Sequence, residues 1–229
     1  MKWLLKTGFT LLVIFVVGSV LITLPLKYIN PIFWSWQLQR EFNPPAGYPA
    51  QAQYRWVNLE QIARPMQLAV IAAEDQLFFD HNGIDIESTK QAFADMRNGK
   101  RLRGASTISQ QTAKNLYLWS GKSMARKVIE AWLALLIEWQ WDKPRILEVY
   151  LNIVEFGPGI YGVEAASRHF YGTSASRLNV QQSARLAAVL PNPYLFNAAA
   201  PSRYQRQRAQ WIQQQKRQLG QAHRDPLYN

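Results

Sequence analysis

The sequence predicts an all-α protein with one N-terminal transmembrane helix, and three observations lead to this fold class. Residues 7–26 contain no charged side chain. From residue 61 onward, apolar residues recur three and four positions apart, which is the spacing of a helix face. No alternating run of apolar and polar residues is bounded by the turn residues of a hairpin. With 229 residues and 48% apolar content the chain can bury a core, which excludes a disordered protein.

The uncharged segment is long enough to cross a bilayer, because a helix of about 20 residues spans about 30 Å. Lys2 and Lys6 precede it and Lys27 follows it. The positive-inside rule therefore places the N-terminus in the cytoplasm and the body outside. A cleaved signal peptide is the alternative, but it would end in a small-x-small site, whereas this run ends in Leu-Pro-Leu-Lys-Tyr. We expect residues 1–27 to be an uncleaved transmembrane anchor.

Residues 28–60 are rich in aromatic residues, proline and glutamine, and they predict a membrane-proximal connector. Trp34 and Trp36 are candidate anchors at the membrane surface, where tryptophan is enriched. The alternative is the edge of a domain that buries these rings. The helical pattern that follows predicts one domain over residues 61–229.

The first helix of this domain is expected over residues 64–79, because the proline at position 65 suits a first turn. Met66, Val70, Glu74 and Phe78 then lie in one row. Glu74 is thus a carboxylate within an apolar row, next to Asp75. Burial of the row would raise the pKa of Glu74, which suits a group that accepts a proton near neutral pH. A surface glutamate or a structural ion pair is the alternative.

Caps and helix breakers predict the remaining helices. Thr107 and Gln110 fit a capping box in a second helix over residues 104–119. Ser123 can cap a third helix that continues to Trp141. Further helices are expected over residues 146–157, 163–172, 181–190 and 204–219, with a glycine-rich turn at 157–162.

A basic stretch without acidic residues lies between Met96 and Ile129. Its eight basic residues are Arg97, Lys100, Arg101, Arg103, Lys114, Lys122, Arg126 and Lys127. Residues 104–107 lead into a helix N-terminus, whose free N–H groups attract anions. The stretch predicts a phosphate or pyrophosphate site, with a solvated basic face as the alternative. Glu130 follows it, and Arg126 and Lys127 can pair with Glu130 on the surface of their own helix.

Composition limits the chemistry further. Cysteine is absent and histidine occurs three times, which excludes disulfides and thiolate sites and argues against a multi-histidine metal centre. P-loop, G-x-S-x-G and H-E-x-x-H motifs are also absent. The net charge of +11 favours an anionic partner, and the anchor favours a membrane over nucleic acid. His81 is expected to fix a loop before Gly83 rather than to act directly in catalysis.

Several segments in order resemble the peptidoglycan glycosyltransferases, a family shared with the N-terminal domains of bifunctional penicillin-binding proteins. AVIAAEDQLFFDHNG resembles the first motif, RGASTISQQTAKN the second, ARKVIE the third and KPRILEVYLNIVEFG the fourth. GIYGVEAASRHFYG and AAVLPNPYLFNAAAPSRY resemble the fifth region, so the match covers about residues 60 to 205. Ala105 departs from the second motif, where the family has a second glycine. The chain ends too soon for the second domain of bifunctional members, so it resembles the monofunctional, membrane-anchored biosynthetic transglycosylases.

The resemblance implies a lysozyme-like glycosyltransferase lobe, a smaller membrane-proximal lobe and a groove between them. It implies an enzyme that polymerises lipid II, the undecaprenyl-pyrophosphate-linked disaccharide-pentapeptide. Glu74 would take the proton from the 4-hydroxyl of the acceptor GlcNAc. That oxygen would attack C1 of the donor MurNAc with inversion and expel undecaprenyl pyrophosphate.

The motif positions imply roles for other residues as well. Glu130 would support catalysis near the leaving pyrophosphate or a cation. Lys114, Arg126 and Lys127 would hold the pyrophosphate. The groove would be lined by Asp75, Phe78, His81, Ser106, Gln110 and Gln111. No organic cofactor is implied, and a need for a divalent cation, Mg²⁺ or Mn²⁺, is left open.

The resemblance also implies a location, which is the cell inner membrane, with a single pass and the catalytic domain on the periplasmic side. The implied partners are lipid II, the nascent glycan strand and the membrane, with proteins of cell-wall synthesis or division as candidates and no nucleic acid. Two other functions stay open. One is a membrane-bound lytic enzyme that uses one glutamate as an acid and needs no pyrophosphate site. The other is a non-catalytic scaffold for wall assembly.

Overall fold

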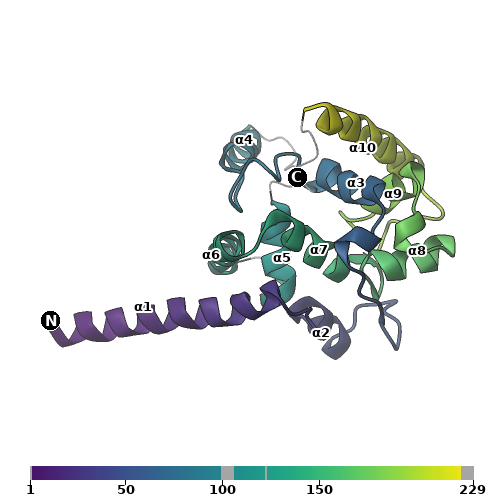
Figure 1. Cartoon of the computed structure of the whole chain (residues 1–229). Coiled ribbons are helices and arrows are strands. Elements are labelled where there is room, and N and C mark those ends of the chain that lie inside the picture. Colours follow the sequence, from purple (N-terminus) through teal and green to yellow (C-terminus); the bar gives the residue numbers. More distant parts are fainter. Residues whose placement is uncertain (1, 99–105, 122, 223–229) are drawn as a thin grey trace.

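The computed structural model describes residues 2–98, 106–121 and 123–222. Over these residues the fold is almost entirely helical, as predicted (Figure 1). The long helix α1 (Lys2–Thr23) extends away from the body and continues into a short 3-10 turn, η1 (Leu24–Lys27). The segment Leu5–Lys27 is long and apolar enough to cross a membrane. Most of its side chains are exposed, which suits a helix surrounded by lipid.

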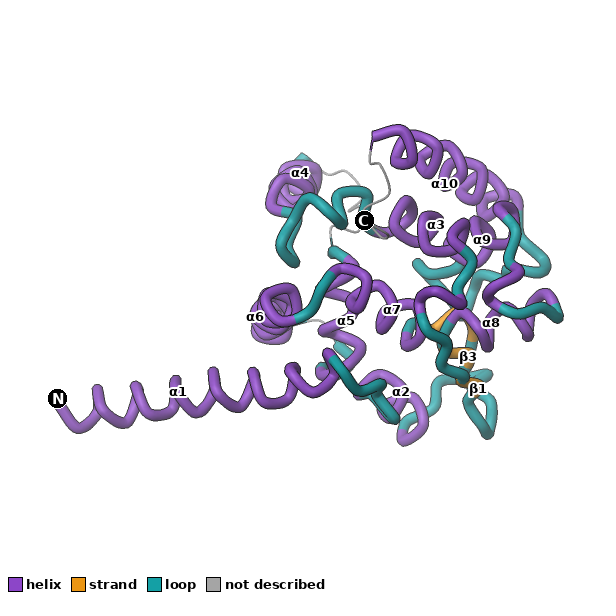
Figure 2. The backbone as a smooth tube through the Cα atoms, in the orientation of Figure 1, coloured by secondary structure: helices purple, strands orange, loops and turns teal. Residues whose placement is uncertain are grey.

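The body consists of helices joined by short turns (Figure 2). The helices are α2 (Ser35–Phe42), α3 (Arg64–Glu74), α4 (Ile86–Arg97), α5 (Ile108–Tyr117), α6 (Met124–Gln140), α7 (Lys143–Ile153), α8 (Val163–Tyr171), α9 (Val180–Ala187) and α10 (Arg203–Ala222), with short 3-10 turns η2 (Leu59–Gln61) and η3 (Ala175–Arg177). α3 packs against α9 and α10, while α5 packs against α6 and α7. The C-terminal end of α3 lies close to the N-terminal end of α5. Polar side chains at these two helix ends are therefore neighbours.

A small sheet joins the connector to the body. β1 (Gln53–Tyr54) pairs in parallel with β3 (Ile160–Tyr161), and β3 pairs antiparallel with β2 (Glu155–Gly157). These strands were not expected from the sequence, because each has only two or three residues. The predicted helix over 146–157 was therefore too long, since α7 ends at Ile153 and the chain then enters β2.

Three other boundaries differ from the prediction. α3 ends at Glu74, because the backbone of Asp75 leaves the helical conformation (φ −159°, ψ 79°), so Phe78 does not share the row of Glu74. The helices α2 and α4 were missed, since α2 lies in aromatic and polar sequence and α4 in largely polar sequence. α10 continues past the glycine at position 220 that was expected to end it. The caps at Thr107, Ser123 and Gly172 are confirmed.

Part of the connector packs into the body. Trp34 is buried, and its ring meets Tyr54 and Tyr161 edge-on at centroid distances of 4.8 and 5.4 Å. The interfacial role predicted for Trp34 is therefore wrong, and the alternative of an aromatic domain edge holds. Trp36 is half-buried against Arg40. The division of the chain at residues 27 and 60 stays a prediction.

The anchor is fastened to the body at several points. The side-chain amide of Gln140 donates to Thr23 Oγ1 at 2.9 Å, and the indole N–H of Trp141 donates to the Thr23 carbonyl at 3.1 Å. Arg145 donates from Nε and Nη2 to the carbonyl of Leu26, at 3.0 and 2.8 Å. These bonds satisfy carbonyl groups that are left free where a helix ends. The end of α1 is thereby held by the end of α6, and η1 by α7.

Gly162 before α8 allows a test of the hairpin that closes the sheet. Its φ of +77° is unfavourable for other residues, and an added Cβ would lie 2.5 Å from the carbonyl oxygen of Asn152. Gly172 also has a positive φ, +61°, but a Cβ there would meet nothing within 4 Å. We expect Gly172→Ala to destabilise the protein by about 1–2 kcal/mol, and Gly162→Ala by clearly more. Thermal unfolding in detergent compares them, and equal losses would contradict this account.

Candidate functional site

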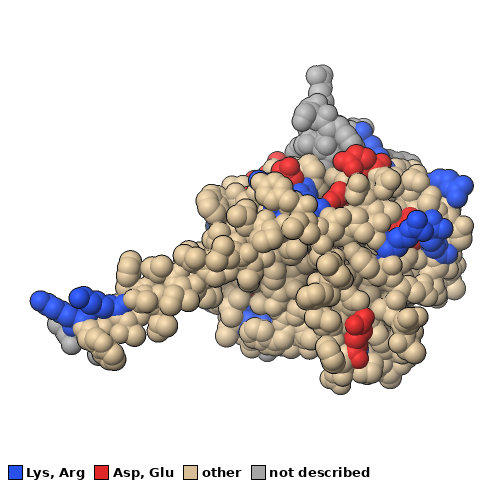
Figure 3. All heavy atoms as spheres, turned by 60° about the horizontal axis from the view of Figure 1, so that its bottom comes forward, with Lys and Arg blue, Asp and Glu red and all other residues tan. Residues whose placement is uncertain are grey.

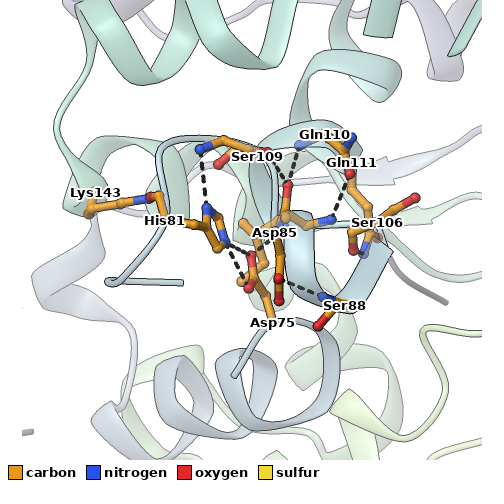
Figure 4. Close-up of polar contacts among 12 residues, drawn as sticks. Asp75, His81, Asp85, Ser88, Ser106, Ser109, Gln110, Gln111 and Lys143 are labelled. Carbon is orange, nitrogen blue, oxygen red and sulfur yellow. Dashed lines mark hydrogen bonds and ion pairs between the residues drawn. The ribbon is translucent and has the colours of Figure 1, made fainter. Parts of the chain in front are cut away.

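A hollow of about 360 Å³ opens beside the C-terminal end of α3. Residues from the end of α3, the start of α4 and the approach to α5 line it: Ala72, Ala73, Glu74, Asp75, Gln76, Leu77, Asp85, Ser88, Ser106 and Thr107. Figure 4 shows the polar side chains of this region pointing toward one another from different elements. The hollow thus contains Glu74, Asp75 and Ser106, three of the residues that the motifs single out.

Glu74 is held in one orientation by neighbouring side chains. Its Oε2 accepts a hydrogen bond from Gln111 Nε2 at 3.0 Å. The Oε1 of Gln111 in turn accepts from the hydroxyl of Tyr150 at 3.0 Å. Tyr150 is fully buried in α7. This chain of bonds positions the carboxylate at the end of α3, and it shows that Gln111 contacts the candidate base itself.

The surroundings of Glu74 favour its protonated form more than water would. Burial raises the pKa of Glu74, whereas the hydrogen bond from Gln111 and the charges of Arg208 and Lys114 lower it, and Asp75 raises it; the net direction is upward. The Glu74 side chain is 14% exposed, and its Oε1 is buried without a hydrogen-bond partner in the described chain. Neither a surface glutamate nor a fully satisfied ion pair describes this group. A carboxylate with a raised pKa and a free oxygen is suited to accept a proton.

Arg208 forms an ion pair with Glu74, with Nη2 of Arg208 3.7 Å from Oε1 of Glu74. Because its positive charge lowers the pKa of Glu74, Arg208→Ala should raise this pKa further. Activity that requires the ionised carboxylate should then be lost at a higher pH on the acidic side of the pH–rate profile. Arg206→Ala is the matched control, since Arg206 is exposed and donates to the carbonyl of Pro201. An acidic limb that is unchanged, or moved to lower pH, would contradict the assignment.

Asp75 and His81 form a structural pair at the rim of the hollow. Both oxygens of Asp75 lie within 3.0 Å of His81 Nε2, and Oδ2 also accepts from the backbone N–H of Ile108 at 2.9 Å. His81 Nδ1 accepts from the N–H of Gly83, so Nε2 is the nitrogen that donates to Asp75 (Figure 4). The prediction that His81 fixes the loop before Gly83 is confirmed. Asp75 holds the first turn of α5, where negative charge is favourable.

Asp75 and Ser106 line this hollow, whereas the other four residues expected in the groove, Phe78, His81, Gln110 and Gln111, are not among its described lining residues. Phe78 is fully buried and packs against Phe79, His81 and the ammonium group of Lys143. The prediction that Phe78 lines the groove is therefore wrong, because the chain leaves the helix after Glu74 and turns this ring into the core. Gln110 is buried as well, and its side chain accepts from the N–H of Thr107 in the capping box. It stabilises the start of α5.

Glu130 lies in a buried cluster of charges on α6. It is 1% exposed, and it accepts from Arg126 Nη1 at 2.8 Å and from Lys127 Nζ at 2.5 Å. Lys127 Nζ also donates to Ser106 Oγ at 2.8 Å. The pairing expected within the helix is thus present, with the Glu130 carboxylate buried and the Lys127 side chain 43% exposed. Ser106 also lines the hollow at Glu74, so it connects this cluster of charges to the hollow.

Lys114 faces the same cluster from α5. Burial lowers the pKa of Lys114, Glu130 raises it, Arg126 and Lys127 lower it, and Glu74 raises it. Its ammonium group lies 5.1 Å from the centroid of the Trp36 ring. With one carboxylate, Glu130, among three cations, the cluster carries a net charge of about two positive units. We expected Lys114, Arg126 and Glu130 to line one cleft with Glu74; instead none of them lines the hollow, and the cluster adjoins it through Ser106.

The donor set does not fit a divalent cation at Glu130. Both of its oxygens already accept from cations, and no group of three histidine, aspartate or glutamate residues gathers anywhere in the part of the chain that the structure describes. We therefore derive no step through a metal ion.

Sequence reasoning missed three residues of the site. Tyr150 lies within the fourth motif, but its spacing gave no sign of a contact with Gln111. Arg208 belongs to a helix that reads as polar and basic throughout. Trp36 comes from the connector. Four members of the basic stretch, Lys100, Arg101, Arg103 and Lys122, and also Gly104 and Ala105, lie outside the described residues.

The fold and the site define a helical protein with one candidate N-terminal transmembrane helix, in which a carboxylate with a raised pKa lies near a cationic cluster. Residues 43–217 match the family model described as transglycosylase. The chain therefore belongs to the transglycosylase family and is a glycosyltransferase.

Curated relatives match along most of their length. The chain is 55% identical over 196 residues to a biosynthetic peptidoglycan transglycosylase of Aeromonas hydrophila, covering 86% of this chain and 83% of the relative. It is 52% identical over 219 residues to the protein of that name from Shewanella oneidensis, covering 94% of each. A third, from Pseudomonas aeruginosa, is 45% identical over 221 residues, covering 96% of this chain and 95% of the relative.

Proposed function

We propose that this peptidoglycan transglycosylase polymerises lipid II into linear glycan strands. The observation that carries the proposal is the position of Glu74, an oriented carboxylate with a raised pKa, next to the cationic cluster of Lys114, Arg126 and Lys127. The first group suits removal of a proton from a sugar hydroxyl, and the second suits a pyrophosphate leaving group.

The proposed reaction is a single displacement with inversion. Glu74 accepts the proton of the acceptor GlcNAc 4-hydroxyl while the oxygen of that hydroxyl forms a bond to C1 of the donor. The bond between C1 and the pyrophosphate oxygen breaks, and undecaprenyl pyrophosphate departs with the electron pair. Lys114, Arg126 and Lys127 stabilise the charge that grows on that group, and Glu130 holds Arg126 and Lys127 in place.

Purified lipid II tests this proposal in one assay. Full-length protein in detergent should form glycan polymer and release undecaprenyl pyrophosphate in proportion to the polymer formed. Cleavage of preformed glycan without polymer would instead identify a lytic enzyme. If folded wild-type protein reacts with neither lipid II nor preformed glycan, the protein is a non-catalytic scaffold and the proposal is overturned.

We propose that the protein crosses the cell inner membrane once and exposes its catalytic domain on the periplasmic side. The apolar segment Leu5–Lys27 and the lysines at positions 2 and 6 support this topology. Protease added to the periplasmic face should digest the body and leave an N-terminal fragment in the membrane. A protected body, or a mature N-terminus near residue 27, would contradict this topology.

A further inference from the structure

A second hollow, of about 890 Å³, lies at the root of the anchor, apart from the hollow at Glu74. The end of α1 and η1 form one side of it, α2 forms the other, and the end of α5 closes it. Its lining is mainly apolar and includes Leu21, Leu26, Ile32, Trp34, Leu38 and Leu116. We call it the anchor groove.

One end of the anchor groove is polar. Gln39, Asn43 and Ser120 lie there, and the same three residues line a smaller pocket that also includes Trp36 and Arg40. Arg40 Nε is buried and has no hydrogen-bond partner in the described chain. The Oε2 of Glu155 lies 3.8 Å away, beyond hydrogen-bond distance. The guanidinium group of Arg40 pairs with Glu155 and lies over the Trp36 ring, but its side chain is 27% exposed, so it brings a partly accessible cation to the polar end of an apolar groove.

The rim of the groove continues the apolar surface of the anchor. Ile32 is 85% exposed and Phe42 is 86% exposed. Figure 3 shows the face around the root of α1, where charged side chains are few and the uncharged surface runs from the anchor onto the body. Where the anchor spans a bilayer, this rim lies at the level at which the helix leaves the hydrocarbon. Lipid, rather than water, is the neighbour that such a rim favours.

We propose that the anchor groove binds one glycerophospholipid of the bilayer, with an acyl chain between α1 and α2 and its phosphate beside Arg40 and Asn43. The combination of apolar walls with a cation at one end matches the two parts of such a lipid. The polyprenyl chain of the substrate is the competing occupant: Lys114 lies against Trp36 at the polar end, but neither Lys114, Arg126 nor Lys127 lines the groove itself. The proposal requires that the anchor spans the membrane, and it does not depend on the reaction assigned to the enzyme.

Native mass spectrometry of the full-length protein tests the proposal. Protein stripped of lipid in detergent is incubated with 1-palmitoyl-2-oleoyl-phosphatidylglycerol, and we expect one phospholipid to be retained. Leu38→Trp should fill the groove and lower retention at least about tenfold. Leu12→Trp is the matched control, because Leu12 is exposed on α1 and does not line the groove. Asn43→Asp should also lower retention about tenfold, since it places a negative charge beside the phosphate without changing the shape of an exposed residue.

Three outcomes would overturn the proposal. Phospholipid retention that is unchanged in both Leu38→Trp and Asn43→Asp would show that the lipid binds elsewhere. Displacement of the phospholipid by an equal concentration of undecaprenyl pyrophosphate would assign the groove to the substrate chain. A dimer of the wild-type protein that Leu38→Trp abolishes would assign it to a second copy. Because Asn43 is exposed, the Asn43→Asp variant should fold, so it tests the proposal even if the Leu38→Trp variant does not fold.

Discussion

Replacing Glu74 with glutamine is expected to lower polymerisation of lipid II by at least about 10²-fold, the lower range for loss of a general base. Glutamine retains the length of the side chain and an oxygen that can accept from Gln111, so the geometry of the site should survive. It cannot take up the proton of the acceptor hydroxyl. Stability should change little, because burial of a neutral amide avoids the desolvation that raises the pKa of the Glu74 carboxyl.

Turnover of fluorescent lipid II and thermal unfolding, measured on the same preparation, separate these effects. Glu87→Gln is the matched control, because its side chain is 81% exposed on α4 and pairs with Lys90. We expect this control to polymerise at the wild-type rate. A Glu74→Gln protein that is folded and retains near-normal turnover would remove Glu74 from the role of base.

Lys114→Ala is expected to lower kcat by an amount that corresponds to about 2–4 kcal/mol, by analogy with the loss of one oxyanion donor. Negative charge on the leaving pyrophosphate grows as its bond to C1 breaks, so a cation beside it acts on the rate as well as on binding. Lys114 is suited to this, because it faces Glu130 and Glu74 and its ammonium group rests against the Trp36 ring. The same variant should bind pyrophosphate-bearing inhibitors more weakly.

Lys90→Ala serves as the control for Lys114→Ala, because Lys90 is exposed on α4 and its pair with Glu87 lies at the surface. Steady-state kinetics on lipid II and inhibitor titrations should leave this control unchanged. If Lys114→Ala polymerised normally, the cationic cluster would revert to a solvated or phospholipid-facing surface. A loss confined to KM would show that Lys114 binds the substrate without stabilising the departing group.

Sequence patterns predicted the helices whose ends are marked chemically. Thr107 with Gln110 and Ser123 begin α5 and α6 as expected, because a side-chain cap satisfies N–H groups whatever the tertiary surroundings. The end of α3 could not be predicted in this way. It depends on Asp75, whose side chain binds His81 and the first turn of α5, and those partners are brought together only by the fold.

The candidate site shows the same division. Position in the motifs placed Gln111 beside Glu74, as the structure does, whereas the α6 charges only adjoin the hollow through Ser106. Tyr150 and Arg208 could not be found from periodicity, because one reaches Gln111 from α7 and the other approaches Glu74 from the C-terminal helix. Phe78, which the resemblance assigned to the groove, is buried for a local reason, since α3 ends four residues before it and the chain then turns its ring into the core.

The bonds from Gln140, Trp141 and Arg145 to the end of the anchor have a mechanical consequence. Where α1 spans a bilayer, a domain on a flexible tether would sample many heights above it, whereas the bonds to the end of α1 would make this domain tilt and turn with the helix. The height of the hollow at Glu74 above the lipid surface is then set by the tilt of a single helix. Bilayer thickness, by changing that tilt, therefore becomes a variable that adjusts where the enzyme works.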